Sequence, residues 1–322
     1  MKAIVYEKYG TLDQLLLREV KNPVPKANEV LVRVFASSVN FNNLVFVKGK
    51  PLIVRIETGL LKPKFKIPGN DIAGRVEAVG TNVSRFQEGD EVFGDTSQYG
   101  FGAFAEYVSV RETELALKPE NLSFEEAATV PEAALVALQA LCDKGKIQKN
   151  HKVLICGASG GIGTFAVQIA KYFGAEVTCT CSSKNVDLVL SLGADQIIDY
   201  NRDDFAKNGA RYDLILATAG SRSMLDYKSA LTSRGICVVT GGTMSQIFRA
   251  MLFGPVISTL GSKKLGSMLV KPNKDLTFVK ELIESGKVKP VIDRSYPLCD
   301  VAEALRHYSE GRTKGKIAIT VS

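Results

Sequence analysis

The sequence lacks any apolar stretch long enough to cross a bilayer. Its longest apolar stretches, residues 133–142 and 251–260, are about half of the ~20 residues that a transmembrane helix needs. Glu7 and Lys8 stand where a secretory signal peptide would need its apolar segment, so no such signal is expected in residues 1–10. The sequence therefore predicts a protein without a transmembrane segment.

Paired cysteine motifs are also missing. None of the six cysteines forms a CxxC pair, and several lie inside apolar runs that are typical of strands. We therefore interpret them as reduced thiols in the core of an intracellular, cytoplasmic protein. They are Cys142, Cys156, Cys179, Cys181, Cys237 and Cys299.

Charge of one sign is not concentrated enough to indicate a nucleic-acid-binding protein. The chain has 41 Lys and Arg against 34 Asp and Glu, a net charge of +7 over 322 residues. This excess fits binding of phosphorylated small molecules better than binding of nucleic acid. With 45% apolar and 23% charged residues, the composition is globular and excludes a disordered, collagen-like or coiled-coil chain. The length favours two domains.

The pattern of the chain changes near Pro119. Before it, short Val- and Ile-bearing runs between turn residues are typical of an antiparallel barrel or sandwich. After it the period is helical, and Ser123 with Glu126 forms a capping-box pair. From His151 short strands alternate with helices, which indicates a doubly wound parallel sheet and an α/β fold. The segment from Pro272 predicts two helices and two strands, and its composition does not say which domain it joins.

A glycine-rich turn follows the strand predicted at 152–156. Gly157 and Gly160 allow a tight turn, Gly161 lets the backbone approach a pyrophosphate, and Gly163 allows close packing of helix and strand. The start of the following helix would stabilise the phosphates, and Ser159 adds a hydroxyl donor. The turn predicts a dinucleotide site, and the alternative is an ordinary tight turn between a strand and a helix.

The end of the next strand indicates which dinucleotide is bound. An Asp or Glu about 20 residues after the glycines would hold the ribose 2′-hydroxyl of NAD, but Ser182, Ser183 and Lys184 stand here instead. Two hydroxyls and one cation suit a 2′-phosphate, over which Tyr200 can close. The sequence therefore favours NADPH over NADH, and the alternative is an ordinary loop with a solvated Lys184.

Several further motifs run through the chain in a specific order. They are residues 28–34, 68–80, 86–93, 102–107, 157–163, 192–195, 269–273 and 314–316. Taken together, they resemble the zinc-independent quinone oxidoreductase branch of the medium-chain dehydrogenase/reductase superfamily, over nearly the whole chain. Residues 178–185 are similar to those of the chloroplast-envelope quinone oxidoreductase homologues and of mitochondrial reticulon-4-interacting relatives.

This resemblance implies a GroES-like β-rich catalytic domain, formed by residues 1–118 and 272–322, and a Rossmann NADPH-binding domain over residues 119–271. It implies an active site in the cleft, a homodimer or homotetramer, and hydride transfer from NADPH to a quinone or an α,β-unsaturated carbonyl compound. The small-molecule electron acceptor would be the main partner, without nucleic acid. The cofactor contacts carried over by position are Ser159, Gly160, Gly161, Ile162, Ser182, Lys184 and Tyr200, with Gly241, Gly242 and Thr243 toward the nicotinamide.

A zinc site is not expected. The Gly-His-Glu motif of related zinc alcohol dehydrogenases is replaced by Gly69, Asn70 and Asp71, and the ligand cysteine near residue 37 is absent. Catalytic zinc normally needs three protein ligands around an open position. The only histidines, His151 and His307, lie far in sequence from this motif. The chain is therefore expected to bind no metal.

Asn40 is the candidate catalytic residue, because it matches the Asn of the family's Asn-Pro-Val-Asp stretch. Its amide would stabilise a developing enolate, and the alternative is an amide that satisfies backbone groups. The three residues after Asn40 differ from the family pattern, and Val45 and Val136 replace a Tyr and a Thr of many relatives. These departures leave open a catalytically weak or inactive NADPH-binding structural or regulatory protein.

The segment from Lys48 to Lys66 is strongly basic. It holds six cations against one acid, Glu57, interleaved with aliphatic residues. It could bind an amphipathic or anionic substrate or make a peripheral contact with a membrane. The alternative is a solvated face with a few buried anchors.

Overall fold

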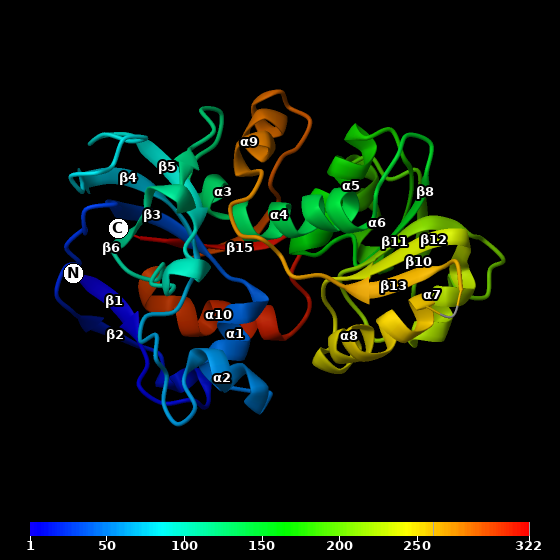
Figure 1. Ribbon diagram of the computed structural model, residues 1–322, viewed down its shortest axis with the longest axis horizontal. Coiled ribbons are helices and arrows are strands. Elements are labelled where there is room, and N and C mark those ends of the chain that lie inside the picture. The colour runs from blue at the N-terminus through cyan, green and yellow to red at the C-terminus, as the bar shows by residue number, and fades with distance from the viewer. Residues whose placement is uncertain (260, 322) are drawn as a thin grey trace. The chain divides into compact units, whose positions relative to one another are not determined.

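The computed structural model describes residues 1–259 and 261–321. Leu260, the last residue of the apolar stretch noted above, lies outside the described residues. The chain divides into two compact units (Figure 1). Unit 1 comprises residues 1–135 and 271–286 and the chain from Pro290 on, and unit 2 comprises residues 136–270 and 287–289. The domain ranges expected from the sequence, 1–118, 119–271 and 272–322, stay a prediction.

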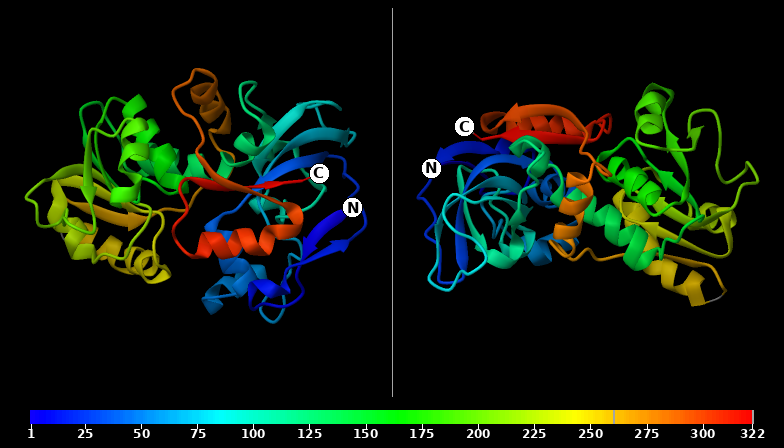
Figure 2. Two further views of the ribbon diagram at one scale, coloured as in Figure 1. Left: turned by 180° about the vertical axis from the view of Figure 1, so that it is seen from behind. Right: turned by 90° about the horizontal axis from the view of Figure 1, so that it is seen from above.

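Unit 1 is built on a mostly antiparallel sheet with the order β14-β15-β3-β4-β5-β7, in which β6 also pairs with β3. The exception is the parallel pair β14 and β15, which are joined through helix α10. Both ends of the chain contribute to this unit (Figures 1 and 2). The strands are β3 (Glu29–Ser38), β4 (Asp71–Val79), β5 (Glu91–Asp95), β6 (Tyr107–Arg111), β7 (Ala116–Leu117), β14 (Ile292–Pro297) and β15 (Lys316–Thr320), with β1 (Lys2–Val5) and β2 (Leu16–Glu19) in a separate hairpin.

Alternation along β3 explains the core of unit 1. Val30, Val32 and Val34 are buried, whereas Arg33 between them is exposed, as expected for a strand with one face on the core. Helix α10 packs its buried residues into the same cluster. The helices are α1 (Phe41–Lys48), α2 (Arg55–Thr58), α3 (Phe124–Ala128), α9 (Leu276–Glu284) and α10 (Val301–Ser309), and α4 (Pro131–Gln139) runs across the division between the units.

Unit 2 contains a six-stranded parallel sheet with the order β10-β9-β8-β11-β12-β13, which confirms the predicted doubly wound α/β fold. The central strand β8 is buried after its first residue because helices cover both faces. In Figure 1, α5 lies on one side of this sheet, and α7 and α8 lie on the other. The strands are β8 (Lys152–Cys156), β9 (Glu176–Cys181), β10 (Gln196–Asp199), β11 (Tyr212–Ala217), β12 (Leu231–Val239) and β13 (Lys264–Ser267).

The helices of unit 2 include one that the sequence did not predict. The apolar stretch at residues 251–260 indicates only that a membrane span is absent there, but α8 covers Met244–Thr259 and edge strand β13 follows it. The other helices are α5 (Gly161–Tyr172), α6 (Val186–Ser191) and α7 (Met224–Ala230), with a short turn η6 (Ser183–Asn185) and a π-helical turn at Ala140–Lys144.

The cysteines are unpaired, and four of the six are buried. The interpretation of all six as core thiols is wrong for Cys299, which is exposed at the short turn before α10, and for Cys142, which is only half-buried. No helix within residues 1–259 and 261–321 combines the length and the apolar character that a membrane span requires.

Candidate functional site

The glycine turn after β8 has the local geometry of an anion site. Helix α5 begins at Gly161, and its N-cap, Gly160, has no side chain to occupy the free N–H groups of the first turn. Gly157 has a φ of +84°, which favours glycine. A Cβ at Gly163 would lie 2.1 Å from the Gly157 carbonyl oxygen. The glycines therefore allow strand and helix to approach closely and leave the helix start accessible to phosphate.

The structure brings this turn together with the ends of two neighbouring strands. The Asn185 side-chain amide, in turn η6, donates to Ser159 Oγ at 2.9 Å. Gly157 N donates to the Thr180 carbonyl oxygen at 3.3 Å, and Tyr200 N donates to the Cys181 carbonyl oxygen at 3.3 Å. Residues 182–184 and Tyr200 therefore lie at the same edge of the sheet as the glycine turn.

The side chains expected at the 2′-phosphate are accessible. Ser183, Lys184 and Tyr200 are exposed, and Ser182 is half-exposed. Within the described residues Lys184 has no ion-pair partner. A cation without a partner beside an anion-binding turn is free to meet a phosphate.

A second group of glycines meets the turn from the other half of the sheet. Thr218 Oγ1 donates to the Gly157 carbonyl oxygen at 3.2 Å, and Gly241 N donates to the Ala217 carbonyl oxygen at 3.2 Å. A Cβ at Gly241 would lie 2.2 Å from the Thr218 carbonyl oxygen, so only glycine fits there. The strand ends of β8, β11 and β12 therefore converge where the sheet order changes direction, the usual ligand position in such sheets.

Gly242 and Thr243 follow in the same loop. Gly242 has a φ of +95°, and Thr243 N donates to the Gly220 carbonyl oxygen at 3.2 Å. Thr243 Oγ1 lies 2.9 Å from Ser245 Oγ. Hydrogen bonds to Gly220, after β11, and within the loop therefore hold it next to the strand ends.

Two buried oxygens at these strand ends have no protein partner within the described chain. They are Asn185 Oδ1, after β9, and Thr240 Oγ1, after β12. A buried polar atom without a partner costs free energy unless a ligand or water satisfies it. Together with the free helix start, these atoms fit a dinucleotide, although the individual cofactor contacts stay predictions.

In unit 1, Asn40 lies in a buried network of amides and carboxyls. Its Nδ2 donates to Asp71 Oδ2 at 2.8 Å and to Asn70 Oδ1 at 3.3 Å, and its Oδ1 accepts from Lys316 Nζ. Asn70 Nδ2 donates to Glu132 Oε2 at 2.8 Å. Both amide hydrogens of Asn40 are engaged, so donation to a substrate would require one of these bonds to exchange. Its catalytic role stays a prediction.

Three carboxyls share this network with one ammonium group. One oxygen each of Asp71, Asp95 and Glu132 lies within 4.8 Å of the others, and Lys316 Nζ is 3.7 Å from Asp71 Oδ2. Burial, followed by repulsion from Asp71 and Asp95, raises the pKa of Glu132 to about 8. Burial, followed by repulsion from Asp71, raises the pKa of Asp95 to about 6. Burial also raises the pKa of Asp71, and Lys316 opposes this effect. Glu132 therefore holds a proton at neutral pH.

Sequence reasoning missed most of this network. Asn42 Nδ2 donates to Glu132 Oε2 at 2.8 Å, and Asn43 Oδ1 accepts from Asn40 N at 2.8 Å. In the sequence, the three residues after Asn40 stand out only as departures from the family pattern. Glu132 lies in the first turn of α4 and belongs to no sequence motif, so no signal in the sequence indicated its place here. Val45 and Val136, the other departures, are buried.

The network does not fit a catalytic zinc ion. Its donors are carboxyls and amides that hydrogen-bond to one another, whereas catalytic zinc sites are built mostly from histidine and cysteine around an open position. The ammonium group of Lys316 already supplies the positive charge beside Asp71. The expectation that the chain binds no metal stays a prediction.

Comparisons with known proteins agree with both units. Residues 26–120 match the family of alcohol dehydrogenase GroES-like domains, and residues 192–319 match a family described as zinc-binding dehydrogenase. The chloroplast envelope quinone oxidoreductase homolog of Arabidopsis thaliana is 32% identical over 339 residues, which cover 99% of this chain and 98% of the relative. The NADPH-dependent alkenal/one oxidoreductase of Arabidopsis chloroplasts is 32% identical over 336 residues, covering 99% of this chain and 79% of the relative.

A solved structure is similar over the same length. The quinone oxidoreductase from Coxiella burnetii has a TM-score of 0.89 at 27% identity and covers 100% of this chain and 99% of its own. The predicted combination of a GroES-like domain with a Rossmann-type domain is therefore confirmed. The chain belongs to the quinone oxidoreductase branch of the medium-chain dehydrogenase/reductase superfamily.

Proposed function

We propose that this protein is a zinc-free, NADPH-dependent reductase that transfers hydride to a quinone or an α,β-unsaturated carbonyl compound. The observation that carries the proposal is the anion-binding turn at Gly157–Gly163, with Ser182, Ser183 and Lys184 beside it in place of a carboxylate. The names of the relatives, which specify quinone and alkenal/one oxidoreductases, support this substrate class.

Each part of unit 2 has a defined task in this proposal. The start of α5 binds the diphosphate through its free N–H groups. Lys184 and the two serines bind the 2′-phosphate, and Asn185 Oδ1 accepts a hydrogen bond from a hydroxyl group of the cofactor. When bound, NADPH supplies the hydride. An acceptor of this class needs no Lewis acid, because the negative charge that forms at carbon is delocalised onto oxygen, so orientation of the reactants provides most of the catalysis.

A cofactor titration tests the 2′-phosphate site. The Kd values of NADPH and NADH are measured for the native protein, for Lys184→Ala and for Lys207→Ala, an exposed lysine of the same unit. We expect tighter binding of NADPH, a loss of about tenfold for NADPH only in Lys184→Ala, and no change in the control. Equal Kd values for the two nucleotides in the native protein would refute the assignment.

A second candidate function is nucleotide binding without turnover. The engaged amide of Asn40 and the apolar Val45 and Val136 favour it. Steady-state oxidation of NADPH with a panel of quinones and enals separates the two. Turnover of any of these acceptors supports the reductase, whereas NADPH binding with no turnover on the whole panel supports the structural or regulatory protein.

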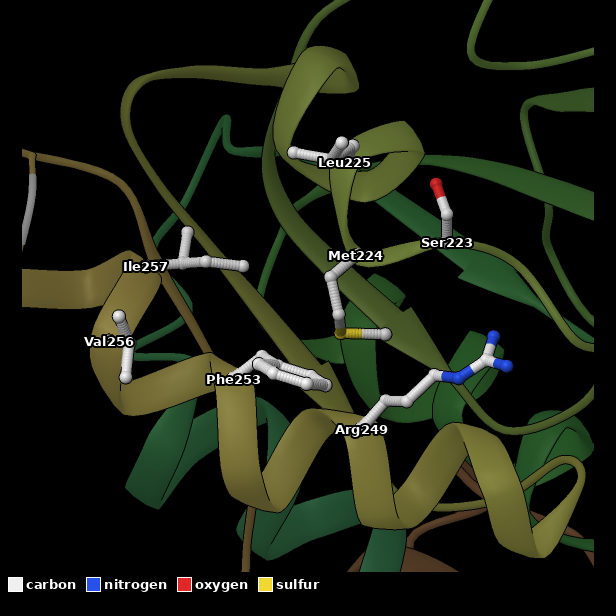
Figure 3. Close-up of a pocket in the computed structure, with 7 residues that line it drawn as sticks. All are labelled: Ser223, Met224, Leu225, Arg249, Phe253, Val256 and Ile257. Carbon is white, nitrogen blue, oxygen red and sulfur yellow. The ribbon is translucent and has the colours of Figure 1, made fainter.

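We also propose that a second copy of the chain covers β13 and α8. β13 is the last strand of the sheet within the described residues, so its outer edge is open to pairing. Next to it α8 exposes four apolar side chains by 51–67%, and α8 packs on β13 through Ser258 Oγ, 2.9 Å from Leu265 N. An adjoining groove of about 250 Å³ lies between α7 and α8. Figure 3 shows its lining residues, with Met224 facing Phe253. An apolar face beside an open strand edge fits a two-fold interface.

Light scattering during gel filtration tests this interface. We expect the native protein at twice the mass of one chain or a multiple of it, and the double variant Leu252→Asp with Phe253→Asp at the mass of one chain. Leu190→Asp, on the exposed side of α6, is the matched control and should not change the mass. A native protein with the mass of one chain would contradict this proposal. The cytoplasmic location stays part of the proposal and is tested by cell fractionation.

A further inference from the structure

The segment between α1 and β4 presents an unusual set of exposed aliphatic side chains. It contains the short turn η2 (Leu52–Val54) and helix α2. In Figures 1 and 2, α2 and the loop after it project from the edge of unit 1 that lies away from β4 and β5. Five large aliphatic residues there are exposed by 56–90%, far more than single surface residues would explain. They are Leu52, Ile53, Ile56, Leu60 and Leu61.

The exposure of these side chains comes from a well-anchored backbone. Tyr9 Oη donates to the Gly59 carbonyl oxygen at 2.6 Å and lies 2.8 Å from Thr58 Oγ1. Arg55 Nε donates to the Gly49 carbonyl oxygen at 3.0 Å, and its guanidinium group lies 4.5 Å from the centre of the Tyr9 ring. These contacts of Tyr9 and Arg55 fix the backbone of the loop. The aliphatic side chains are therefore exposed on an ordered backbone.

Leu60 and Leu61 occupy the tip of a tight reversal of the chain. Gly59 has a φ of +114°, and a Cβ there would lie 2.2 Å from the Lys62 carbonyl oxygen. Lys64 N donates to the Thr58 carbonyl oxygen at 2.7 Å, which closes the loop at its base. The two leucines therefore project together, with Leu61 exposed by 90%.

The same segment carries several exposed cations. Lys50, Lys62, Lys64 and Lys66 are exposed, and Glu57 is the one acid within residues 48–66. Aliphatic residues at a tip and cations in the same segment match the two layers of an anionic membrane, its acyl chains and its phosphates. A merely solvated face would not place two adjacent leucines at its most exposed point.

We propose that residues 48–66 dock this protein on an anionic lipid surface, with Leu60 and Leu61 inserted among the acyl chains and the flanking lysines bound to phosphate groups. This contact goes beyond the proposed reductase activity and does not depend on it. It would hold the protein where apolar electron acceptors dissolve.

Vesicle flotation with the full chain tests the proposal. The vesicles contain phosphatidylcholine alone or phosphatidylcholine with phosphatidylglycerol, at low and at high salt. We expect binding to the anionic vesicles only, with a loss of binding at high salt because salt screens exposed charges. Lys62→Gln with Lys64→Gln should weaken binding about thirtyfold, and Leu60→Ser with Leu61→Ser about tenfold or more.

Matched variants separate the segment from surface composition in general. Leu269→Ser removes an aliphatic side chain that is 91% exposed elsewhere, and Lys144→Gln with Lys149→Gln removes two exposed charges of unit 2. Neither should weaken binding. Unchanged melting temperatures show that the variants fold. Equal binding to neutral and anionic vesicles, or no binding to either, overturns the proposal. It is also overturned if the leucine variant keeps its vesicle affinity and instead raises the KM for a water-soluble acceptor, which would identify the segment as part of a substrate site.

Discussion

Replacing Glu132 by glutamine should change the pH dependence of stability in a specific direction. Glu132 is surrounded by Asp71 from β4, Asp95 from β5, Lys316 from β15 and the Tyr308 ring from α10. Its Oε2 accepts hydrogen bonds from two amide groups. Glutamine offers an oxygen for these amides and an N–H group where the protonated carboxyl has its O–H, so Glu132→Gln mimics the protonated state at every pH.

The magnitude follows from the shift in pKa. Burial and the neighbouring carboxyls raise the pKa of Glu132 from 4.5 to about 8. Between these two values the folded protein keeps a proton that the unfolded chain releases, so the free energy of unfolding falls as pH rises. Because one pKa unit corresponds to about 1.4 kcal/mol, the loss from this group is about 5 kcal/mol when pH 8 is reached. The loss is absent below about pH 4.

The measurement is the urea-dependent unfolding of unit 1, monitored by hydrogen exchange in β3 and β4, from about pH 4 to about pH 9. The stability of Glu132→Gln relative to the native protein should rise with pH, from near zero at about pH 4 toward about 5 kcal/mol above about pH 8. Glu88→Gln, at an exposed position, should show no such rise. Parallel pH curves for the native protein and Glu132→Gln would refute the reasoning that a buried carboxylic acid sits in this network.

Three further changes test other parts of the structure. Gly163→Ala places a carbon 2.1 Å from the Gly157 carbonyl oxygen, so calorimetry should show a lower melting temperature and no NADPH binding. Gly160→Ala is the control for stability, because its added carbon would have only a contact at 3.5 Å. Equal melting temperatures for the two variants would contradict the packing argument. Ser123→Ala removes the capping bond to the 126 N–H group and should lower the free energy of unfolding by about 1 kcal/mol in urea titrations, against no effect if the cap is unimportant. Asn273→Ala removes hydrogen bonds to residues 95 and 114 and should cost about 3 kcal/mol. Residue 273 has a φ of +58°, which glycine tolerates better than alanine. If the lost hydrogen bonds cause the effect, Asn273→Gly should be as unstable as Asn273→Ala. A more stable Asn273→Gly would show that backbone strain causes the effect.

The glycine turn was predictable because its chemistry is local. A buried strand, four glycines and a helix follow one another directly in the sequence, and the structure places them as β8, the turn and α5. The capping box at Ser123 is local in the same way and is confirmed by a bond from the Glu126 N–H group. Motifs whose residues are all close together in the sequence can be recognised without knowing the fold.

Helix α8 and strand β13 could not be predicted in this way. α8 contains Gly254 and Pro255, which lower helix propensity, and it forms because Gly254 lets it pack against Leu265 of β13. β13 has one large apolar residue and a glycine, so its pattern carries no period. Tertiary contact decided both elements.

The carboxyl network was hidden for a different reason. Asn70 and Asp71 are recognisable in the sequence as replacements in a metal-binding motif. Their hydrogen-bond and ion-pair partners, however, come from α4 and β15. Glu132 and Lys316 look like ordinary charged residues in sequence, because nothing local marks a charged side chain for burial. Their role appears only when the strands are paired.

The distance between Asn40 and Lys316 along the chain has a consequence for biosynthesis. Their side chains are bonded across 276 residues, and β15, which carries the lysine, pairs with β3 near the N-terminus. The amino-terminal part of the chain leaves the ribosome first. Asp71 therefore cannot pair with Lys316 until translation is nearly finished. The intervening α/β sheet can assemble during that interval. Nascent chains stalled before β15 should therefore carry a folded parallel sheet of unit 2 and an incomplete, protease-sensitive amino-terminal segment.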